Sequence, residues 1–425
     1  METSPKIPPK ALWGWVSYDM GNSVFTTTVM AGFFPIFFKS FWSQGVDPAL
    51  STARLGATVS VASLVVALCA PFLGALSDQG GNKRWFLLAF SSLGFCFTGL
   101  LALIPAGGWP LAVLAYSGAI FGFYGANLFY DALLPSLAPE DQRDWVSSLG
   151  YAFGYLSGGL VFALNLAMVK APGFFGLEGA QQGVQASFLT SSVAWALGSF
   201  LCFFWVPEKK VPPSQALWTQ TWAELAATYQ ELKSYRTAWT FLVAYWLYID
   251  VVDTLVVMAV DYGLSLGFES GDLILALLMV QLIGFPSALV IAKGGARFGV
   301  RRMIYLCLAV YAGVCLWAVG LSVRWEFFLM AGLIGVVQGG VQALSRSYFA
   351  GLIPKEQAGE FFGFYNMLGK FATILGPALI GGVGLVVSLG WSGSDPHLGT
   401  RLGFASLLLP LGLGTWFFYR AKPTA

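Results

Sequence analysis

The chain has 425 residues, of which 57% are hydrophobic and only 10% are charged, and its formal net charge is +2. A soluble domain of ordinary composition carries about 25% charged residues, whereas the mean hydropathy here is +0.70. The composition therefore excludes a soluble globular protein. The small net charge gives no reason to expect a nucleic-acid partner. We expect an integral membrane protein.

The apolar residues fall in continuous runs. A helix that crosses a bilayer needs about 20 mainly apolar residues, whereas the strands of an outer-membrane barrel are segments of about ten residues with alternating polarity. The sequence therefore predicts an all-α protein. The N-terminal residues lack the cleavage site of a secretory signal, so the first span is expected to remain. Twelve spans are predicted, at 11–41, 53–76, 85–105, 110–137, 145–169, 184–206, 237–265, 271–292, 302–322, 326–352, 360–389 and 401–419.

Basic residues gather in the loops on one side of the predicted membrane, as the pairs Lys83–Arg84, Lys209–Lys210 and Arg301–Arg302 illustrate. Lysine and arginine accumulate on the cytoplasmic side of membrane proteins. Both termini are therefore predicted to be cytoplasmic.

The cysteines and the lone histidine show no metal-ligand spacing. All five cysteines lie inside predicted spans, where we interpret them as small apolar packing residues. His397 lies in the last outer loop, and one imidazole cannot build a zinc site. We expect no metal and no cofactor. The cysteines are Cys69, Cys96, Cys202, Cys307 and Cys315.

A polar segment in the middle of the chain separates six spans from six. Within 207–236, apolar residues recur at helical spacing between Trp218 and Leu232, a pattern typical of a helix that lies in the headgroup plane. The two sides of this segment show internal similarity, because LAPEDQ at 137–142 returns as LIPKEQ at 352–357. We predict two parallel repeats, an N-terminal half at 1–206 and a C-terminal half at 237–425 joined by the linker 207–236.

The loop after the second span carries the pattern G-x-x-x-D-x-x-G-x-K-R. With its two six-helix halves and amphipathic central loop, the chain resembles the major facilitator superfamily over nearly its whole length. A second copy, at 296–302, keeps the glycine and the basic pair but has Ala296 in place of the acid. The residues of the first copy are Gly74, Asp78, Gly81, Lys83 and Arg84.

Two further stretches resemble a narrower family. They are W-x-x-Y-D-x-x-N-S-x-F-x-T-T at 15–28 and the run at 339–377 that contains LSRSYFAGLIPKEQ. Both are similar to the vacuolar amino-acid effluxers linked to autophagy and to their bacterial relatives. The resemblance implies a twelve-helix major facilitator fold, a membrane transporter, and a solute such as an amino acid. It also favours the inner membrane of a bacterium.

Ionisable residues inside the predicted spans are the first candidates for a transport site, because a charge at membrane depth costs several kcal/mol. The resemblance implies that spans one, four, seven and ten line a central cavity. Every one of these charged candidates falls on one of those spans: Asp19, Asp131, Asp250, Asp253 and Arg346.

Asp250 and Asp253 lie deep in the seventh span. If that span begins near Thr237, a rise of about 1.5 Å per residue places them roughly 20 and 24 Å along it, at or beyond the middle of a hydrocarbon core about 30 Å thick. Residues three apart share a helical face, and two close carboxyls disfavour double ionisation. The pair can therefore hold an exchangeable proton, or it can belong to a purely structural network.

Asp19 and Asn22 repeat this spacing on the first span. Asp19 suits a cation or a substrate ammonium, and Asn22 can donate and accept hydrogen bonds; the alternative is a structural cap or pair near the helix end. Asn127, four residues before Asp131, and Gln342, four before Arg346, extend the polar stripes of spans four and ten.

Asp131 and Arg346 occupy equivalent places in the two repeats. A bridge between them would tie the halves together and break when the cytoplasmic side opens. Two alternatives remain: Arg346 binds a substrate carboxylate, or Asp131 pairs with Lys83 or Arg84 in its own half. We predict a gate made by Asp131 and Arg346 together with the loop residues Asp78, Lys83 and Arg84.

These observations predict a monomeric secondary transporter, embedded in membrane lipids, that moves a small zwitterion by alternating access with proton or sodium coupling. A multidrug or organic-cation exporter is the first alternative, and a non-transporting receptor or scaffold is the second. The sequence contains no nucleotide-binding fingerprint. It also shows no constellation of nucleophile, histidine and acid, so we expect no enzyme.

Overall fold

The computed structural model describes residues 7–44, 64–66, 68–78, 82–208, 235–390 and 398–421, and in these ranges every regular element is helical. The α-helices are α1 (Pro9–Val24), α2 (Phe34–Phe37), α4 (Lys83–Leu101), α5 (Trp109–Leu137), α6 (Glu140–Lys170), α7 (Ala180–Trp205), α9 (Arg236–Ser265), α10 (Ser270–Phe298), α11 (Val300–Gly320), α12 (Arg324–Ala350), α13 (Ala358–Gly390), α14 (Leu398–Ser406) and α15 (Leu408–Arg420). The π-helical segments Phe25–Phe33 and Phe38–Trp42 flank α2, and a short 3₁₀ turn covers Pro172–Phe175.

The described residues include ten helices that are long and apolar enough to cross a membrane. The first of them runs without interruption from Pro9 to Trp42. Two shorter apolar helical segments, Leu68–Asp78 and Leu375–Gly384, overlap the predicted spans 53–76 and 360–389. The helical architecture therefore agrees with the predicted series of spans, and the protein is a multi-pass membrane protein.

The chain forms two compact units. Unit 1 is made of Met1–Leu225 and Pro354–Met367, and unit 2 of Ala226–Ile353 and Leu368–Ala425. The boundary falls inside α13, whose first residues belong to unit 1. The predicted amphipathic helix of the linker lies outside the described residues, so the linker and the boundaries of the two halves stay predictions.

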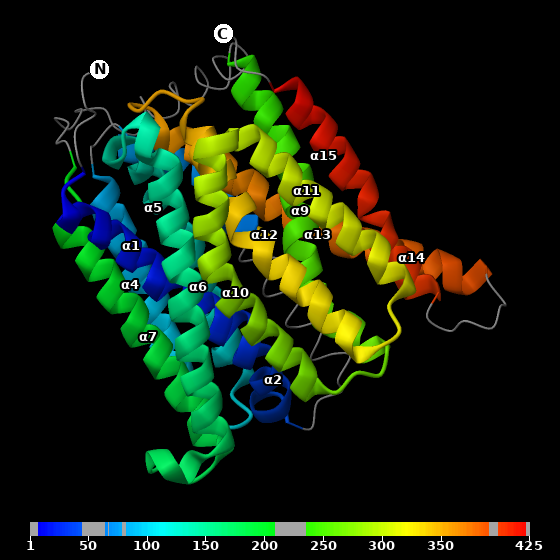
Figure 1. The fold of residues 1–425 in the computed structure, drawn as a ribbon. Coiled ribbons are helices and arrows are strands. Elements are labelled where there is room, and N and C mark those ends of the chain that lie inside the picture. The colour runs from blue at the N-terminus through cyan, green and yellow to red at the C-terminus, as the bar shows by residue number, and fades with distance from the viewer. Residues whose placement is uncertain are drawn as a thin grey trace. The chain divides into compact units, whose positions relative to one another are not determined.

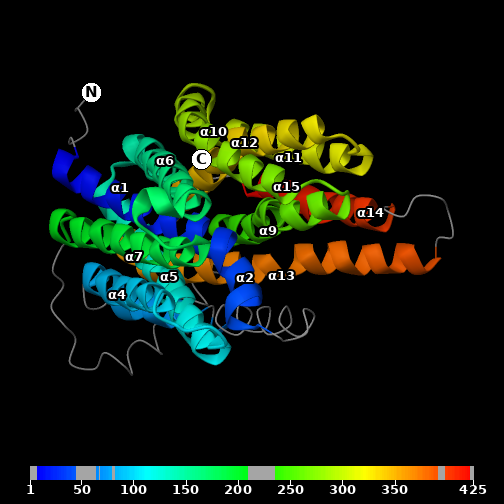
Figure 2. The same ribbon diagram turned by 90° about the horizontal axis from the view of Figure 1, so that it is seen from below.

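In unit 1, α4 packs on α5, and α1 packs on both α7 and α6; Figures 1 and 2 show these helices side by side. The α4–α5 contact is close because it joins two glycines. A Cβ on Gly122 would overlap the backbone of Gly94. Small residues let membrane helices approach each other in this way.

In unit 2, α10 packs on α12, α11 packs on α12, and α9 packs on α15 (Figure 2). A close approach again depends on glycine, because a Cβ on Gly335 of α12 would lie 3.1 Å from the backbone of Val280 on α10. Each unit is thus a helical bundle whose apolar side chains face either one another or lipid.

Candidate functional site

A buried polar cluster joins α1 to α5 in unit 1. The carboxyl of Asp19, 6% exposed, accepts a hydrogen bond of 3.0 Å from the hydroxyl of Tyr130. The ring of Tyr130 stacks on that of Trp15 with 4.3 Å between centroids, and the Trp15 indole donates to the Tyr130 carbonyl at 3.2 Å. Asp19 lies about 15 Å from the start of α1. It is therefore well inside the helix rather than a terminal cap.

Asn127 of α5 holds two side chains of α1. Its Oδ1 accepts 2.7 Å from Asn22 Nδ2 and 3.2 Å from the Tyr18 hydroxyl. Among the described residues, no donor reaches Asn22 Oδ1, although this atom is buried. Buried acceptors of this kind usually have a partner, so this amide oxygen is available to a ligand.

Asp250 of α9 is completely buried in unit 2, with 0% exposure. Its Oδ1 accepts the backbone N–H of Gly376 on α13 at 3.0 Å, one residue before Pro377, which lies inside that helix. In the described part of the chain, Asp250 Oδ2 and the hydroxyl of Thr254 one turn further along lack hydrogen-bond partners. The sequence did not reveal Gly376 as the partner, because that bond joins side chain to backbone between helices far apart in the chain.

Asp253 points to a different helix. Its Oδ1 lies 3.5 Å from Nε2 of Gln342 on α12. The two carboxyls on one face of α9 thus contact two separate helices, α13 and α12. Each acid therefore contacts a different neighbouring helix, and the exchange of a proton by this pair stays a prediction.

Asp131 and Arg346 are both buried, in unit 1 and unit 2 respectively. Within unit 1, Asp131 accepts 3.2 Å from Nδ2 of Asn366, in the first turns of α13. Lys83 and Arg84 make their ion pairs with Asp78 and Glu208, not with Asp131. A bridge between Asp131 and Arg346 stays a prediction.

Asp78 is bound by a helix start. Its two carboxylate oxygens accept the backbone N–H groups of Gly359 and Glu360 at 3.0 and 2.8 Å. Its Oδ1 also lies 2.5 Å from the ammonium of Lys83. The acid therefore caps the N-terminus of α13 and satisfies N–H groups that have no partner within that helix.

Arg84 caps the C-terminus of α7, as Asp78 caps the N-terminus of α13. Its guanidinium donates to the carbonyls of Phe203 and Val206 at 3.0 and 2.8 Å, at the C-terminus of α7. Glu208 completes the loop, because its carboxylate accepts the N–H groups of Lys83 and Arg84 at 2.6 and 3.2 Å. The basic pair predicted for gating thus joins the start of α4 to the end of α7.

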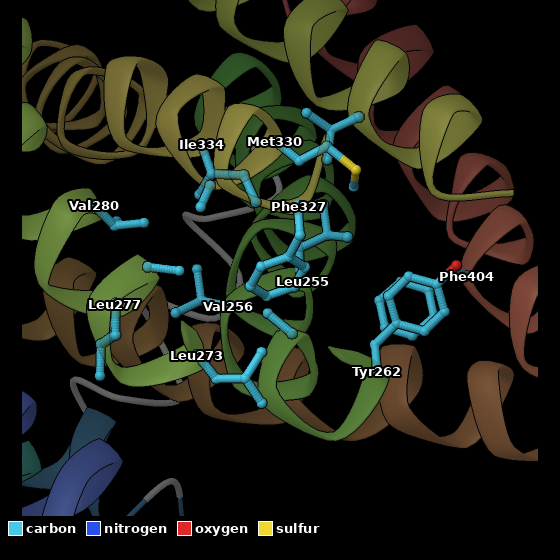
Figure 3. Close-up of a pocket in the computed structure, with 14 residues that line it drawn as sticks. Leu255, Val256, Tyr262, Leu273, Leu277, Val280, Phe327, Met330, Ile334 and Phe404 are labelled. Carbon is cyan, nitrogen blue, oxygen red and sulfur yellow. The ribbon is translucent and has the colours of Figure 1, made fainter. Parts of the chain in front are cut away.

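An apolar cavity of about 50 Å³ lies within unit 2, between α9, α10 and α12 (Figure 3). Leu255 and Val256 of α9 and Ile334 of α12 are among its walls. Tyr262 and Phe404 close one side, with 4.1 Å between ring centroids. The cavity begins within about one helical turn of Asp253 and offers no charged group.

Comparisons with known proteins decide the family. The family model described as "Vacuole effluxer Atg22 like" matches residues 51–384. The chain is 36% identical over 369 residues to the uncharacterised MFS-type transporter YxiO of Bacillus subtilis, with 86% of each chain covered. This chain belongs to the Atg22-like family of major facilitator transporters.

More distant relatives support the same assignment. Autophagy-related protein 22-2 of Emericella nidulans is 21% identical and matches 89% of this chain and 86% of its own. The crystal structure of the human organic anion transporter MFSD10 superposes with a TM-score of 0.74 at 17% identity and covers 97% of this chain and 100% of its own. The structural likeness confirms the predicted major facilitator fold. The resemblance stated from the sequence is also confirmed.

The sequence predicted the candidate acids of this Atg22-like transporter but not most of their partners. Tyr18 was not among the predicted site residues, yet its hydroxyl reaches the same Asn127 that holds Asn22. Tyr130, Asn366 and Glu208 were also missed as partners. A signal existed for Tyr130, because α1 and α5 correspond to spans one and four, which the resemblance places around one cavity.

Replacing Asp78 with alanine is expected to lower the free energy of unfolding of the transporter by about 2–3 kcal/mol. The substitution leaves two N–H groups of α13 without an acceptor and Lys83 without its counter-ion. Thermal unfolding of the purified protein in detergent measures the effect. Asp141→Ala removes an exposed carboxylate from the first turn of α6 and serves as control, with a loss below about 1 kcal/mol. Equal losses in both variants would contradict the capping role.

Proposed function

We propose that this transporter moves a small zwitterion, such as an amino acid, across the membrane by alternating access coupled to protons. The observation that carries the proposal is the set of carboxyl and amide side chains within spanning helices, of which Asp19, Asn22 and Asp250 are buried. Asp19 and Asn22 form one cluster in unit 1 with the half-buried Asn127, and the half-buried Asp253 and Gln342 form another in unit 2. Burying these groups in a membrane is costly unless they serve a solute or an ion.

The unit 1 cluster suits a substrate ammonium. Asp19 supplies a negative charge, and Asn22 supplies an amide oxygen that no protein donor satisfies among the described residues. A primary ammonium has three N–H donors and no acceptor, so acceptors of this kind complement it. Arg346, as a planar guanidinium, suits a carboxylate. It is assigned either to the solute or to the gate with Asp131.

The coupling proton is assigned to Asp250. A carboxylate that is completely buried and has no ion-pair partner among the described residues is expensive to keep charged. Its Oδ2 also has room for a proton, because no donor among the residues that the structure describes reaches that atom. Asp253, one turn away, is the second member of the exchanging pair.

The loop between the helical segment Leu68–Asp78 and α4 is assigned to gating. The bonds of Asp78 to the start of α13 must break if that end of α13 moves during transport. Lys83 and Arg84 stabilise the same loop. We further propose that the transporter is a monomer in a bacterial inner membrane with both termini in the cytoplasm, as the charge bias of its loops predicts.

The test is uptake into liposomes by the purified full-length protein. A panel of amino acids and amines is screened with and without an inward pH gradient, for wild type and for Asp250→Asn/Asp253→Asn. We expect accumulation of at least one zwitterion that depends on the gradient in wild type and is lost in the double variant. Asp141→Asn removes a surface carboxylate and should retain full activity.

Uptake that is equal with and without the gradient, in both proteins, would contradict proton coupling. Uptake driven by a sodium gradient would keep the transporter and replace its coupling ion. No transport of any panel member under either gradient would contradict the proposed solute class.

The apolar cavity in unit 2 favours a second candidate, export of lipophilic cations. Its walls are aliphatic and aromatic, and Asp253 lies about one turn away along α9. A cationic dye would place its rings against such walls and its charge near the acid. Gradient-dependent dye transport in the same liposomes, together with inactivity toward zwitterions, would favour this candidate over the first.

A further inference from the structure

The loop before α4 in unit 1 and the corresponding loop before α11 in unit 2 differ in their acidic residues. In unit 1 each basic residue of the loop has an acid beside it: Lys83 lies 2.5 Å from Asp78, and Arg84 lies 3.5 Å from Glu208. Glu208 also binds the N–H groups at the start of α4. Two carboxylates thus neutralise the cations and the helix N-terminus at this end of unit 1.

Unit 2 has an arginine contact like that of Arg84, but the sequence has no acid at the positions that correspond to Asp78 and Glu208. Arg301 donates to the carbonyls of Phe418 and Ala421 at the end of α15, as Arg84 does at the end of α7. The shift of 217 positions that relates Arg84 to Arg301 puts Gly295 in the place of Asp78. The shift of 215 that relates the Val206 carbonyl to the Ala421 carbonyl puts Pro423 in the place of Glu208. Among the side chains that the structure describes, none caps the start of α11. Positive charge therefore accumulates at this end of unit 2.

Three further cations line an open groove of about 510 Å³ between the end of α10 and the start of α11. Lys293 and Arg297 lie four residues apart and so share a face of α10, and Arg302 comes from α11. All three are exposed, and none forms an ion pair with a carboxylate in the part of the chain that the structure describes. The guanidinium of Arg297 lies 5.3 Å from the ring centroid of Phe298, also in the groove.

The rest of the groove is apolar and faces outward. Val290 and Leu306 are 66% and 55% exposed on spanning helices, and Met303 packs over Gly294. Exposed aliphatic side chains on such helices contact lipid tails. A cluster of cations where the helices leave the membrane, with apolar walls below it, matches the two parts of a phospholipid.

We propose that this groove binds an anionic phospholipid of the leaflet at this end of α10. The phosphate diester takes the place of the carboxylates that the second repeat has lost, and an acyl chain follows Val290 and Leu306. Basic pockets between helices on the cytoplasmic side recognise anionic headgroups in this way. The charge bias of the loops assigns this end to the cytoplasm. The site is separate from the acids assigned to transport.

To test the proposal, the delipidated full-length protein is titrated with phosphatidylglycerol or with phosphatidylcholine. The number of bound lipids is then measured by native mass spectrometry. Each cation near a membrane surface contributes about fivefold to anionic lipid binding. The groove variant Lys293→Gln/Arg297→Gln/Arg302→Gln should therefore bind the first phosphatidylglycerol on the order of a hundredfold more weakly than wild type. A charge-matched control, Arg236→Gln/Lys355→Gln/Arg420→Gln, removes exposed cations elsewhere and should stay within about threefold.

Two results would overturn the proposal. Equal affinity of the groove variant and wild type for phosphatidylglycerol would show that the groove is not the site. Displacement of phosphatidylglycerol by millimolar inorganic phosphate would show that the groove binds a free anion instead of a lipid. Unchanged unfolding temperatures in a neutral detergent verify folding. If the triple variant unfolds, the single variant Arg302→Gln replaces it and is expected to lose about fivefold in affinity for phosphatidylglycerol.

Discussion

Glutamine in place of Arg301 is expected to lower the free energy of unfolding by about 2–4 kcal/mol, because hydrogen bonds to a charged group contribute about 1.5–3 kcal/mol each. The Arg301 guanidinium donates to the Phe418 carbonyl at 2.7 Å and to that of Ala421, and it lies 4.7 Å from the Phe418 ring centroid. Without it, the Phe418 carbonyl loses the donor from Arg301 and the Ala421 carbonyl keeps the Tyr348 hydroxyl, at 3.0 Å, so α15 separates more easily from α11. Scanning fluorimetry of the purified protein in a neutral detergent measures the loss.

The neighbouring arginine is a matched control. Arg302→Gln removes the same charge one position along, but its side chain is exposed and makes no ion pair among the described residues. Its loss should stay within about 0.5 kcal/mol. Neutral detergent matters, because a lipid that binds only the folded protein would add to its stability. Equal losses for the two variants would contradict the assigned role of Arg301.

Arg84→Gln is expected to lower the free energy of unfolding for the same reason, because Arg84 binds the end of α7 in the first repeat as Arg301 binds the end of α15 in the second. Arg84 and Arg301 are both the second residue of their helices, α4 and α11. Aligning the letters of the motif had matched Lys83 and Arg84 with Arg301 and Arg302, a shift of 218 positions. The contacts instead equate Arg84 with Arg301, a shift of 217. The position within the helix decides where a side chain points, so residue patterns alone misplace this pair by one position.

The fold could be predicted from the sequence because its cause is local. Long apolar runs must be helical in a bilayer, where every backbone group needs a partner within its own segment. The buried acids could be identified for a related reason, since their cost at membrane depth is visible without any contact map. Asp19 and Asp250 are indeed buried, at 6% and 0% exposure.

The partners of these acids could not be predicted, because they depend on how each helix is rotated and where it bends. Asp250 binds a backbone N–H at Gly376, and a glycine in an apolar run gives no hint of that contact. A close approach of α9 to α13 makes it possible, since a Cβ on Gly376 would overlap the Thr254 side chain. Tyr18 is adjacent to Asp19 in the sequence and so lies about 100° from it around α1, but its long side chain carries the hydroxyl to Asn127.

Asp250→Asn and Asp250→Ala are expected to separate the two roles of this residue. Asparagine keeps an oxygen that can accept the Gly376 N–H but cannot release a proton at neutral pH. Alanine removes both functions. Loss of a proton-transfer group costs enzymes on the order of a hundredfold in rate, and we expect a loss of similar size in gradient-driven uptake for both variants. Only alanine should also lower the free energy of unfolding, by about 1–3 kcal/mol, because it leaves a buried N–H without an acceptor.

Solute exchange across liposomes without a gradient provides the decisive readout. Exchange needs the solute site and the conformational change but no net proton movement, so Asp250→Asn should retain it while losing accumulation. Asp141→Asn should retain both. If Asp250→Asn accumulates solute as well as wild type, the carboxyl acts only as an acceptor for α13 and the coupling group lies elsewhere. If the asparagine variant loses exchange together with accumulation, Asp250 belongs to the solute site itself, and the proton must then be sought at Asp253.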